Sequence, residues 1–321
     1  METKKVPKRL EDENNQTEAK IVVGLCTFNR YEQLKEALDS LSRVQLPEKV
    51  KVEFVLVDND ENGGAKYIFD ANVPDMPFEC HYFIEKNRGL CNARNRVLEE
   101  AINLGATEIA MFDDDEIVTE EWLVELYKAI KNSKYHGVCG TVYRLLPMES
   151  SDLVKRFWET KKFEKERSLP MIGTNNCIFS VDLVKPDGMN IRFDNEFNFS
   201  GREDLVFSFD AQVKGAKFMS AKEAIVIEKF SKNRSTIRYL LRRWFAGGLS
   251  DVAVARRYKF QMTRRTIVEI FTIPLRLLSF IPIMLFNHVN GMQTILRVAS
   301  SIGWLCGLFG KRANYYMKHK D

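Results

Sequence analysis

The chain has 321 residues, of which 45% are hydrophobic and 29% are charged, so it can bury a large core and is not disordered throughout. The formal net charge is +4, but eleven basic residues and a single acid lie between Lys229 and Arg265. That segment carries roughly +10 and the rest of the chain roughly −6, which predicts different partners for the two parts.

The N-terminal residues 1–20 are polar and contain no apolar run, so we expect a flexible tail and no signal peptide. The six cysteines form no C-x-x-C pair, and the four histidines form no H-E-x-x-H motif. These spacings argue against a disulfide framework and against a zinc site. They favour reduced cysteines in a cytosolic protein.

Residues 21–140 alternate short apolar segments with amphipathic ones. Strands are predicted over residues 21–26, 52–57 and 108–112, and helices over residues 30–44, 91–106 and 119–132. This alternation predicts an α/β fold with a mainly parallel sheet covered by helices. Ligands of such sheets gather at the carboxyl ends of the strands, where this sequence has Asp58 and, in "FDDDE", Asp113 to Asp115.

The three consecutive aspartates repel one another unless a cation lies among them. Hard divalent ions such as Mn²⁺ and Mg²⁺ take carboxylate oxygens together with substrate phosphates, and Asp113 and Asp115 point the same way if the segment is extended. A calcium EF-hand is excluded because Ile117 and Val118 stand where an oxygen ligand and a glycine are needed. Neither G-x-G-x-x-G nor a P-loop motif occurs.

The middle of the chain is more mixed. Residues 150–170 are charged and predicted to be helical, and "GTNNCIFSVDLV" returns to strand character. The segment "GREDLVFSFDAQVKG" predicts a helix with Leu205, Phe209 and Val213 on its buried face.

Residues 266–310 are the most apolar part of the chain, but Pro274, Pro282 and several polar residues interrupt them. We therefore expect a hairpin of interfacial or re-entrant helices, and not two clean transmembrane spans. The preceding basic segment supports membrane association through attraction to anionic lipid. The alternative is an amphipathic helix pair that caps the globular core.

Five motifs resemble those of the family-2 glycosyltransferases with the GT-A fold, and they occur in the family's order. They are "VGLCTFNR", "VLVDND", "NRGLCNARN", "FDDDE" and "GRED", and they cover residues 21 to about 215. The resemblance implies a GT-A domain over residues 21–228, with a nucleotide-binding half (21–140) and an acceptor half (141–228). A basic helical segment (229–265) and apolar membrane-associating helices with a basic tail (266–321) are expected to follow.

The resemblance also implies roles for individual residues. It assigns binding of the nucleotide-sugar to Thr27, Asn29, Asp58, Asn87, Gly89, Arg94 and Asp113. It assigns a divalent metal, Mn²⁺ or Mg²⁺, to Asp115 and Asp113, the acceptor to Asn176, Glu203, Arg243 and Trp244, and the catalytic base to Asp204.

Two positions depart from the family pattern. Many relatives have a histidine metal ligand after the last core strand, whereas "IVIEKFSKNRS" offers Glu228 here. Processive relatives carry Q-x-x-R-W, whereas "LLRRW" has Leu240 at the first position, which favours transfer of a single sugar.

The resemblance implies an inverting glycosyltransferase that moves one sugar from a nucleotide-diphosphate sugar, with a UDP-sugar favoured, to an acceptor hydroxyl. The basic segment and the apolar tail favour a lipid-linked or cell-envelope glycan acceptor at the cytoplasmic face of the membrane, an anionic membrane surface as partner, and no nucleic acid. One alternative is a membrane-associated scaffold with a degenerate, non-catalytic transferase domain. Another is a sugar-1-phosphate nucleotidyltransferase, although its Gly-rich basic signature after the first strand is missing. DNA binding by the basic segment is a third.

Overall fold

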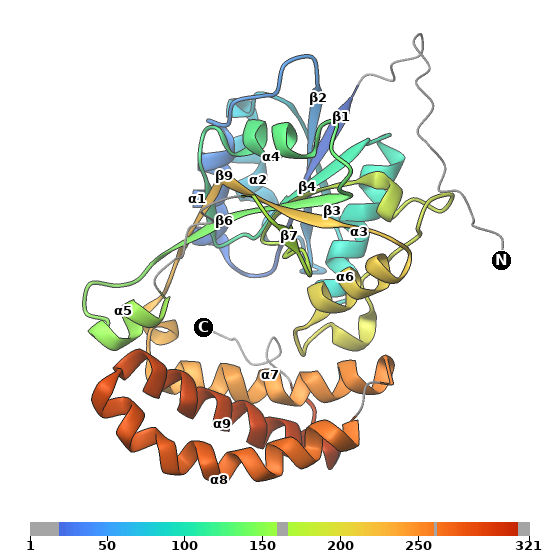
Figure 1. The fold of residues 1–321 in the computed structure, drawn as a ribbon. Helices are drawn as coiled ribbons and strands as arrows, with labels where there is room; N and C mark the ends of the chain where they lie inside the picture. The colour runs from blue at the N-terminus through green and yellow to red at the C-terminus, as the bar shows by residue number, and fades with distance from the viewer. Residues whose placement is uncertain (1–18, 159–165, 260–261, 314–321) are drawn as a thin grey trace, which may run out of the picture.

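The computed structural model describes residues 19–158, 166–259 and 262–313. A nine-stranded sheet with helices on both faces makes up one part of the molecule, and three long helices lie in a layer beneath it (Figure 1). The tail predicted over residues 1–20 falls outside the described residues, apart from its last two positions.

The first part of the sheet is parallel. Its strands are β1 (Lys20–Thr27), β2 (Lys51–Asp58), β3 (Glu79–Ile84) and β4 (Glu108–Phe112), and its helices are α1 (Tyr31–Leu41), α2 (Lys66–Asn72) and α3 (Leu90–Asn103). The strands lie in the order β3-β2-β1-β4, all parallel. The strands predicted over residues 21–26, 52–57 and 108–112 are confirmed, and their carboxyl ends meet at one edge of the sheet.

The second part of the sheet is mixed. Its strands are β5 (Glu116–Val118), β6 (Gly137–Leu145), β7 (Ser168–Leu169), β8 (Asn176–Ser180) and β9 (Phe218–Lys229), and its helices are α4 (Trp122–Ile130), α5 (Asp152–Trp158) and α6 (Glu203–Val213). Strand β8 runs antiparallel to β4 and β6, whereas β6 and β9 are parallel and β5 and β7 pair antiparallel with β9. The expectation of a mainly parallel sheet is therefore correct for the first four strands and for the pair β6 and β9, whereas the other pairs are antiparallel.

Two cores hold the helices to the sheet. On one face, Ile21, Val23 and Leu25 of β1 pack with the buried sides of α1, α2 and α4. On the other face, Val22 of β1 packs with the buried sides of α3 and α6. Because side chains alternate along a strand, a strand that is covered on both faces is apolar at nearly every position, as β1 and β2 are.

The buried face of α6 differs from the predicted one. Val213 is 79% exposed, whereas Val206, Phe207 and Ala211 are fully buried. Phe207 packs on Phe179 of β8 and stacks on Phe193, which comes from the loop before α6. The predicted helix is correct, but the face that it buries is rotated by one position.

Short 3-10 turns complete the described fold. They are η1 (Val73–Asp75), η2 (Val181–Leu183), η3 (Asn195–Phe197) and η4 (Lys232–Arg234). The last of these is the only regular element between β9 and the helical layer in the part of the chain that the structure describes. It therefore links the sheet to the helices beneath.

The helical layer consists of α7 (Ile237–Arg257), α8 (Met262–Phe286) and α9 (His288–Leu308). Helix α7 lies nearest the sheet, α9 packs between α7 and α8, and α8 lies farthest away (Figure 1). Gly248 of α7 and Gly303 of α9 allow these two backbones to approach closely, because a Cβ on Gly248 would lie 2.0 Å from the Ser300 carbonyl oxygen.

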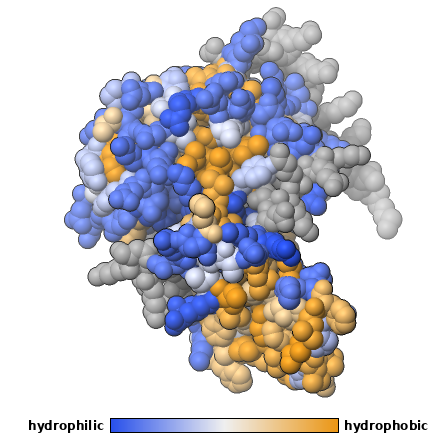
Figure 2. All heavy atoms as spheres, turned by 90° about the vertical axis from the view of Figure 1, so that its left-hand side faces the viewer, coloured by the Kyte–Doolittle hydropathy of each residue, from blue (hydrophilic) through white to orange (hydrophobic). Residues whose placement is uncertain are grey.

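Helix α8 presents an apolar surface to the outside, seen as the hydrophobic lower lobe in Figure 2. Its exposed side chains include Phe271 (70%), Leu278 (76%) and Leu285 (75%). Among the described residues, α8 is the one helix that is long and apolar enough to cross a membrane. A C-terminal region of this composition is compatible with membrane association.

Candidate active site

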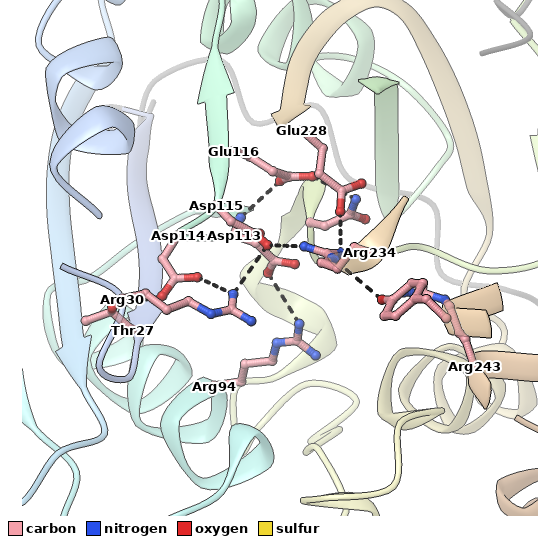
Figure 3. Close-up of polar contacts among 12 residues, drawn as sticks. Thr27, Arg30, Arg94, Asp113, Asp114, Asp115, Glu116, Glu228, Arg234 and Arg243 are labelled. Atoms are coloured by element: carbon pink, nitrogen blue, oxygen red, sulfur yellow. Dashed lines mark hydrogen bonds and ion pairs between the residues drawn. The ribbon is translucent and has the colours of Figure 1, made fainter. Parts of the chain in front are cut away.

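The acidic cluster lies at the carboxyl end of β4, beside the ends of β1 and β9 (Figure 3). Three arginines from distant parts of the chain reach into it: Arg30 follows β1, Arg94 lies on α3, and Arg234 lies in η4. Each guanidinium contacts at least two carboxylates. The cation that the sequence requires among the aspartates is therefore supplied in part by the protein itself.

Asp114 is the most enclosed of the three aspartates, with 5% exposure. Its carboxylate accepts hydrogen bonds of 2.8 Å from the Thr27 hydroxyl and from the Arg30 guanidinium. Thr27 thus holds the aspartate loop, and its contact with the nucleoside stays a prediction. Arg30 also lies 3.4 Å from Asp115.

Asp113 joins the cluster to the predicted catalytic base through Arg94. The Arg94 Nη1 donates to Glu203 at 2.7 Å and to Asp204 Oδ1 at 3.0 Å, and its Nη2 lies 3.5 Å from Asp113 Oδ1. The Thr174 hydroxyl also donates to Asp204 Oδ1, at 2.9 Å. No described residue hydrogen-bonds Asp204 Oδ2, so this oxygen is available to a substrate.

Asp115 faces the far side of the cluster. The Arg234 Nη1 donates to Asp115 Oδ2 at 2.8 Å, and its Nη2 donates to Glu228 at 2.7 Å. Glu228, at the end of β9, is also 3.4 Å from the Arg144 guanidinium. The carboxylate that stands where many relatives have a histidine ligand therefore lies beside the predicted metal ligand Asp115.

The cluster holds more acids than bases. Seven carboxylates contact four arginines or one another: Asp113, Asp114, Asp115, Glu116, Glu203, Asp204 and Glu228, with Arg30, Arg94, Arg144 and Arg234. Burial, followed by repulsion from Asp115 and Asp204, raises the pKa of Asp113 to about 7, although Arg94 lowers it. Burial and repulsion also raise the pKa of Glu116 and of Glu203. An additional bound cation would reduce the repulsion among these carboxylates.

Glu116 and the segment before β8 line the same cluster. The Glu116 carboxylate accepts from the Asp113 backbone N–H at 3.1 Å and from the Asn175 side chain at 3.0 Å. Asn176 was expected to bind the acceptor, but it is 1% exposed. Its amide donates to two backbone carbonyls and its oxygen accepts from Trp122. The Asn176 side chain is therefore part of the sheet, whereas Asn175 contacts Glu116 of the cluster.

Asp58 and Glu203 are also enclosed. Asp58 is fully buried, and its carboxylate accepts from the Tyr82 hydroxyl at 2.7 Å and from two backbone N–H groups. Glu203 is 5% exposed and accepts from Arg94 at 2.7 Å, so it is placed to orient this arginine. Asp58 thus fixes the loop after β2, and Glu203 fixes the position of Arg94.

Asn29 and Asn87 lie on exposed loops at the same edge of the sheet. The loop before α3 is fixed by Asn59, whose side chain donates to the Asn87 carbonyl at 3.0 Å and accepts from the Gly89 N–H at 2.7 Å. Gly89 has φ 142°, and a Cβ there would lie 2.4 Å from Asn198. This close approach requires glycine.

Arg243 and Trp244 lie on α7, and Arg243 lies at some distance from the aspartates (Figure 3). The Arg243 guanidinium donates to the Tyr239 hydroxyl at 3.2 Å, and the same hydroxyl accepts from Arg234 Nε at 3.3 Å. Trp244 packs on the small core between α5, α7 and α9. Arg243 is therefore connected to the cluster through Tyr239, whereas Trp244 holds the helices together.

A separate group of potential metal ligands lies away from this edge. Glu53, Glu79 and His81 bring their ligand atoms within 4.8 Å of one another, the one such group among the described residues. Two lysine ammonium groups, of Lys20 and Lys51, lie 2.7 and 2.6 Å from Glu53. These cations already neutralise Glu53, and the group lies near the amino ends of β2 and β3.

Several site residues carried no functional assignment from the sequence. Arg30 lies inside the motif "VGLCTFNR", and Arg234 is one of eleven basic residues between 229 and 265. Thr174 and Asn175 lie in the segment "GTNNCIF", which is similar to the family's G-x-N segment that lines the donor and acceptor cleft, but Asn176 was the one residue of it named for the site. A sequence motif could have indicated Arg30, whereas nothing local distinguishes Arg234 from its basic neighbours.

Comparisons with known proteins agree on one family. The model of "Glycosyl transferase family 2" matches residues 22–185, about half of the chain. The succinoglycan biosynthesis protein ExoM of Rhizobium meliloti (strain 1021) is 27% identical over 232 residues, covering 71% of this chain and 72% of ExoM.

Two solved structures show the same fold. The mannosyltransferase PcManGT from Pyrobaculum calidifontis, in complex with GDP-Man and Mn²⁺, has a TM-score of 0.60 at 15% identity, with 91% of this chain and 88% of that one covered. S. aureus TarS 1-349 has a TM-score of 0.51 at 15% identity, with 71% of this chain covered, and the chain spans 65% of that structure. Both likenesses confirm the expected GT-A arrangement. With its aspartate loop at the edge of this sheet, the chain belongs to glycosyl transferase family 2.

Proposed function

We propose that this protein is a metal-dependent inverting glycosyltransferase. In this proposal it moves one sugar from a nucleotide-diphosphate sugar to a hydroxyl of a lipid-linked or cell-envelope glycan, at the cytoplasmic face of the membrane. The observation that carries the proposal is that the Arg94 guanidinium contacts both Asp113 and Asp204. A cationic group therefore lies between the proposed donor site and the proposed base.

The donor site is proposed at the aspartate loop. The excess of carboxylates and the raised pKa of Asp113 support a divalent cation there, and Asp115 and Glu228 offer oxygen ligands of the kind that Mn²⁺ and Mg²⁺ take. A divalent ion held by these residues would neutralise charge on the leaving diphosphate. GDP-Man and Mn²⁺ are bound by the neighbour PcManGT; the proposal keeps a UDP-sugar as the favoured donor and leaves the choice of base to experiment.

Asp204 is the proposed general base. Its Oδ1 is fixed by Arg94 and Thr174, so Oδ2 can take the proton of the attacking hydroxyl. Arg94 is 4% exposed, and its buried guanidinium can stabilise charge that develops between donor and acceptor. Direct displacement from the face opposite the leaving group inverts the anomeric carbon.

The acceptor is proposed to reach this site from a membrane. The apolar outer face of α8 supports contact with acyl chains, and the exposed basic residues of α7 (Arg238, Arg242 and Arg243) support contact with anionic headgroups or with a phosphate of the acceptor. The relative ExoM is a succinoglycan biosynthesis protein, which favours an envelope polysaccharide as the product.

The test separates chemistry from binding. Purified protein is incubated with Mn²⁺, a panel of nucleotide-sugars and a lipid extract of the cells that make it, and release of nucleoside diphosphate is measured. Asp204→Asn should lower the rate by ~10²–10⁴ while donor affinity stays within about twofold. The exposed control Asp187→Asn should retain the wild-type rate.

Equal rates for Asp204→Asn and wild type would show that Asp204 is not the general base. Donor binding by the wild-type protein without any release of nucleoside diphosphate, across all donors and extracts, would support the alternative of a membrane-associated scaffold with a non-catalytic domain.

A further inference from the structure

Arg234 holds the two carboxylates that the proposed metal requires. Its guanidinium lies 2.8 Å from Asp115 and 2.7 Å from Glu228 (Figure 3). Its Cζ also lies over the Phe230 ring, 4.9 Å from the ring centroid. A planar guanidinium satisfies two carboxylates at once through parallel donors. In this arrangement Arg234 takes up one oxygen of each carboxylate, Oδ2 of Asp115 and Oε1 of Glu228.

The charge of Arg234 opposes a metal ion at the same place. A guanidinium stays charged at any physiological pH, and this one lies within hydrogen-bond distance of both carboxylates. A guanidinium and a divalent ion a few ångströms apart repel each other strongly even at the effective dielectric of a protein surface. Metal and guanidinium therefore cannot both lie between these carboxylates.

Arg234 lies in a shorter and less regular element than Arg94, and it does not lead into a helix directly as Arg30 does. Arg30 directly precedes α1, and Arg94 is buried within α3 at 4% exposure. Arg234 sits in the short turn η4, whose other residues Lys232 and Asn233 are exposed. A small change in this turn can withdraw its side chain without disturbing the sheet.

We propose that Arg234 is an exchangeable counter-ion: it holds Asp115 and Glu228 in the ligand-free enzyme, leaves them when the divalent ion binds, and is then free to contact the diphosphate of the donor. The inference rests on the proposed metal and donor site. Because η4 leads directly into α7, where Tyr239 contacts both Arg234 and Arg243, the exchange also links donor binding to the first turns of the helical layer.

The test measures Mn²⁺ affinity without nucleotide, from the EPR signal of free Mn²⁺, in the full-length protein. Arg234→Gln removes the competing cation and should bind Mn²⁺ about tenfold more tightly than wild type. Arg234→Lys keeps the charge but can reach only one carboxylate, so its affinity should lie between the two. The control Arg238→Gln removes the same charge from an exposed position on α7 and should match wild type within about twofold.

An independent readout uses the wild-type protein alone. Hydrogen exchange of the amides in residues 232–235 should accelerate when Mn²⁺ is added without nucleotide, because the contacts of Arg234 are released. Unchanged or weaker Mn²⁺ binding by Arg234→Gln, or unchanged exchange at saturating Mn²⁺, would overturn the exchange. Absence of Mn²⁺ binding by wild type and all variants, with and without nucleoside diphosphates, would instead overturn the metal site and the exchange together.

Discussion

Single carboxylates in this protein depend on cations that come from distant parts of the chain. Glu53 of β2 is an example outside the active site, since it is 2% exposed and contacts Lys20, Lys51 and His81. Burial alone raises the pKa of a carboxyl, but hydrogen bonds from these three partners outweigh it and hold the pKa of Glu53 at about 2. The folded state therefore favours the ionised form of this residue.

Replacement of Glu53 by glutamine should destabilise the protein by about 2–4 kcal/mol at pH 7, because it leaves two lysines without their buried partner. The folded-state pKa lies below the ordinary value of 4.5, so the contribution of Glu53 is complete above pH 4.5 and is lost as the pH falls toward 2. Urea unfolding at pH 7, 5 and 3 should show that the difference in free energy of unfolding between Glu53→Gln and wild type decreases only between pH 5 and pH 3.

Glu79→Gln is the matched control, because Glu79 lies beside Glu53 but is 62% exposed, and its effect should stay within about 0.5 kcal/mol. A gap between Glu53→Gln and wild type that is constant from pH 7 to 3 would contradict the role given to the ionised carboxylate.

At the scale of single residues, the sequence indicates which residues lie in the site better than it indicates their contacts. The motifs identified Asp113, Asp115, Arg94 and Asp204, which the structure brings together. The contacts of Asp115 were not predictable, because Arg234 lies 119 residues away along the chain. Whether Asn175 or Asn176 faces the site depends on where β8 begins, and a shift of one residue along a strand exchanges the two faces.

Among the elements, the pair α7 and α9 shows how small residues set a helix interface. A Cβ on Gly248 would lie 2.0 Å from the Ser300 carbonyl oxygen, and one on Gly303 would lie 2.1 Å from the Phe245 carbonyl oxygen. Both contacts are with backbone, which cannot rotate away. The two helices are therefore held at a distance that any side chain at these positions would increase.

Gly248→Ala should destabilise the protein by about 1–3 kcal/mol, because the added methyl group forces α7 and α9 apart. In an open helix position the same change stabilises by up to about 1 kcal/mol. The adjacent Gly247→Ala is the control, since its Cβ would meet only the end of the Arg202 side chain, at 3.0 Å. Equilibrium unfolding measures the free energy of unfolding of both variants, and equal values would contradict the close packing of α7 and α9.

Elements with strong periodicity were predicted well, and elements defined by tertiary contact were not. Strands β1, β2 and β4 are apolar over nearly their whole length and were visible in the sequence. The face of α6 was misjudged because apolar residues occupy several of its sides, so that only packing on Phe179 and Phe193 selects Phe207. Strand β7 has two residues and exists only through its pairing with β9.

The whole molecule consists of a polar sheet domain above an apolar helical layer (Figures 1 and 2). Helix α8 runs alongside α9, and its polar residues Arg276 and Glu269 pair with each other and with Ser301 of α9. The exposed apolar side chains are left on its outer surface. A helix with one apolar face and one face attached to the protein is suited to lie in a membrane interface.

Phe271→Glu combined with Leu278→Glu should lower binding to vesicles that contain anionic lipid by at least about tenfold, since burial of each side chain contributes about 1.5–3 kcal/mol. Sedimentation with vesicles measures the effect. The control Val213→Glu places a charge on an exposed apolar residue of the sheet domain, 79% exposed, and should leave binding unchanged. Equal binding by both variants would exclude α8 as the membrane contact.

The central claim is that the aspartate loop binds a divalent ion together with a nucleoside diphosphate. Thermal unfolding with UDP, GDP, dTDP and CDP, each with and without Mn²⁺, tests it most directly. A ligand at about 100 times its dissociation constant stabilises the folded state by about 2.7 kcal/mol. We predict that one nucleotide raises the melting temperature only when Mn²⁺ is present, and that Asp115→Ala abolishes this increment. No stabilisation by any of the four nucleotides at saturating Mn²⁺ would contradict the claim.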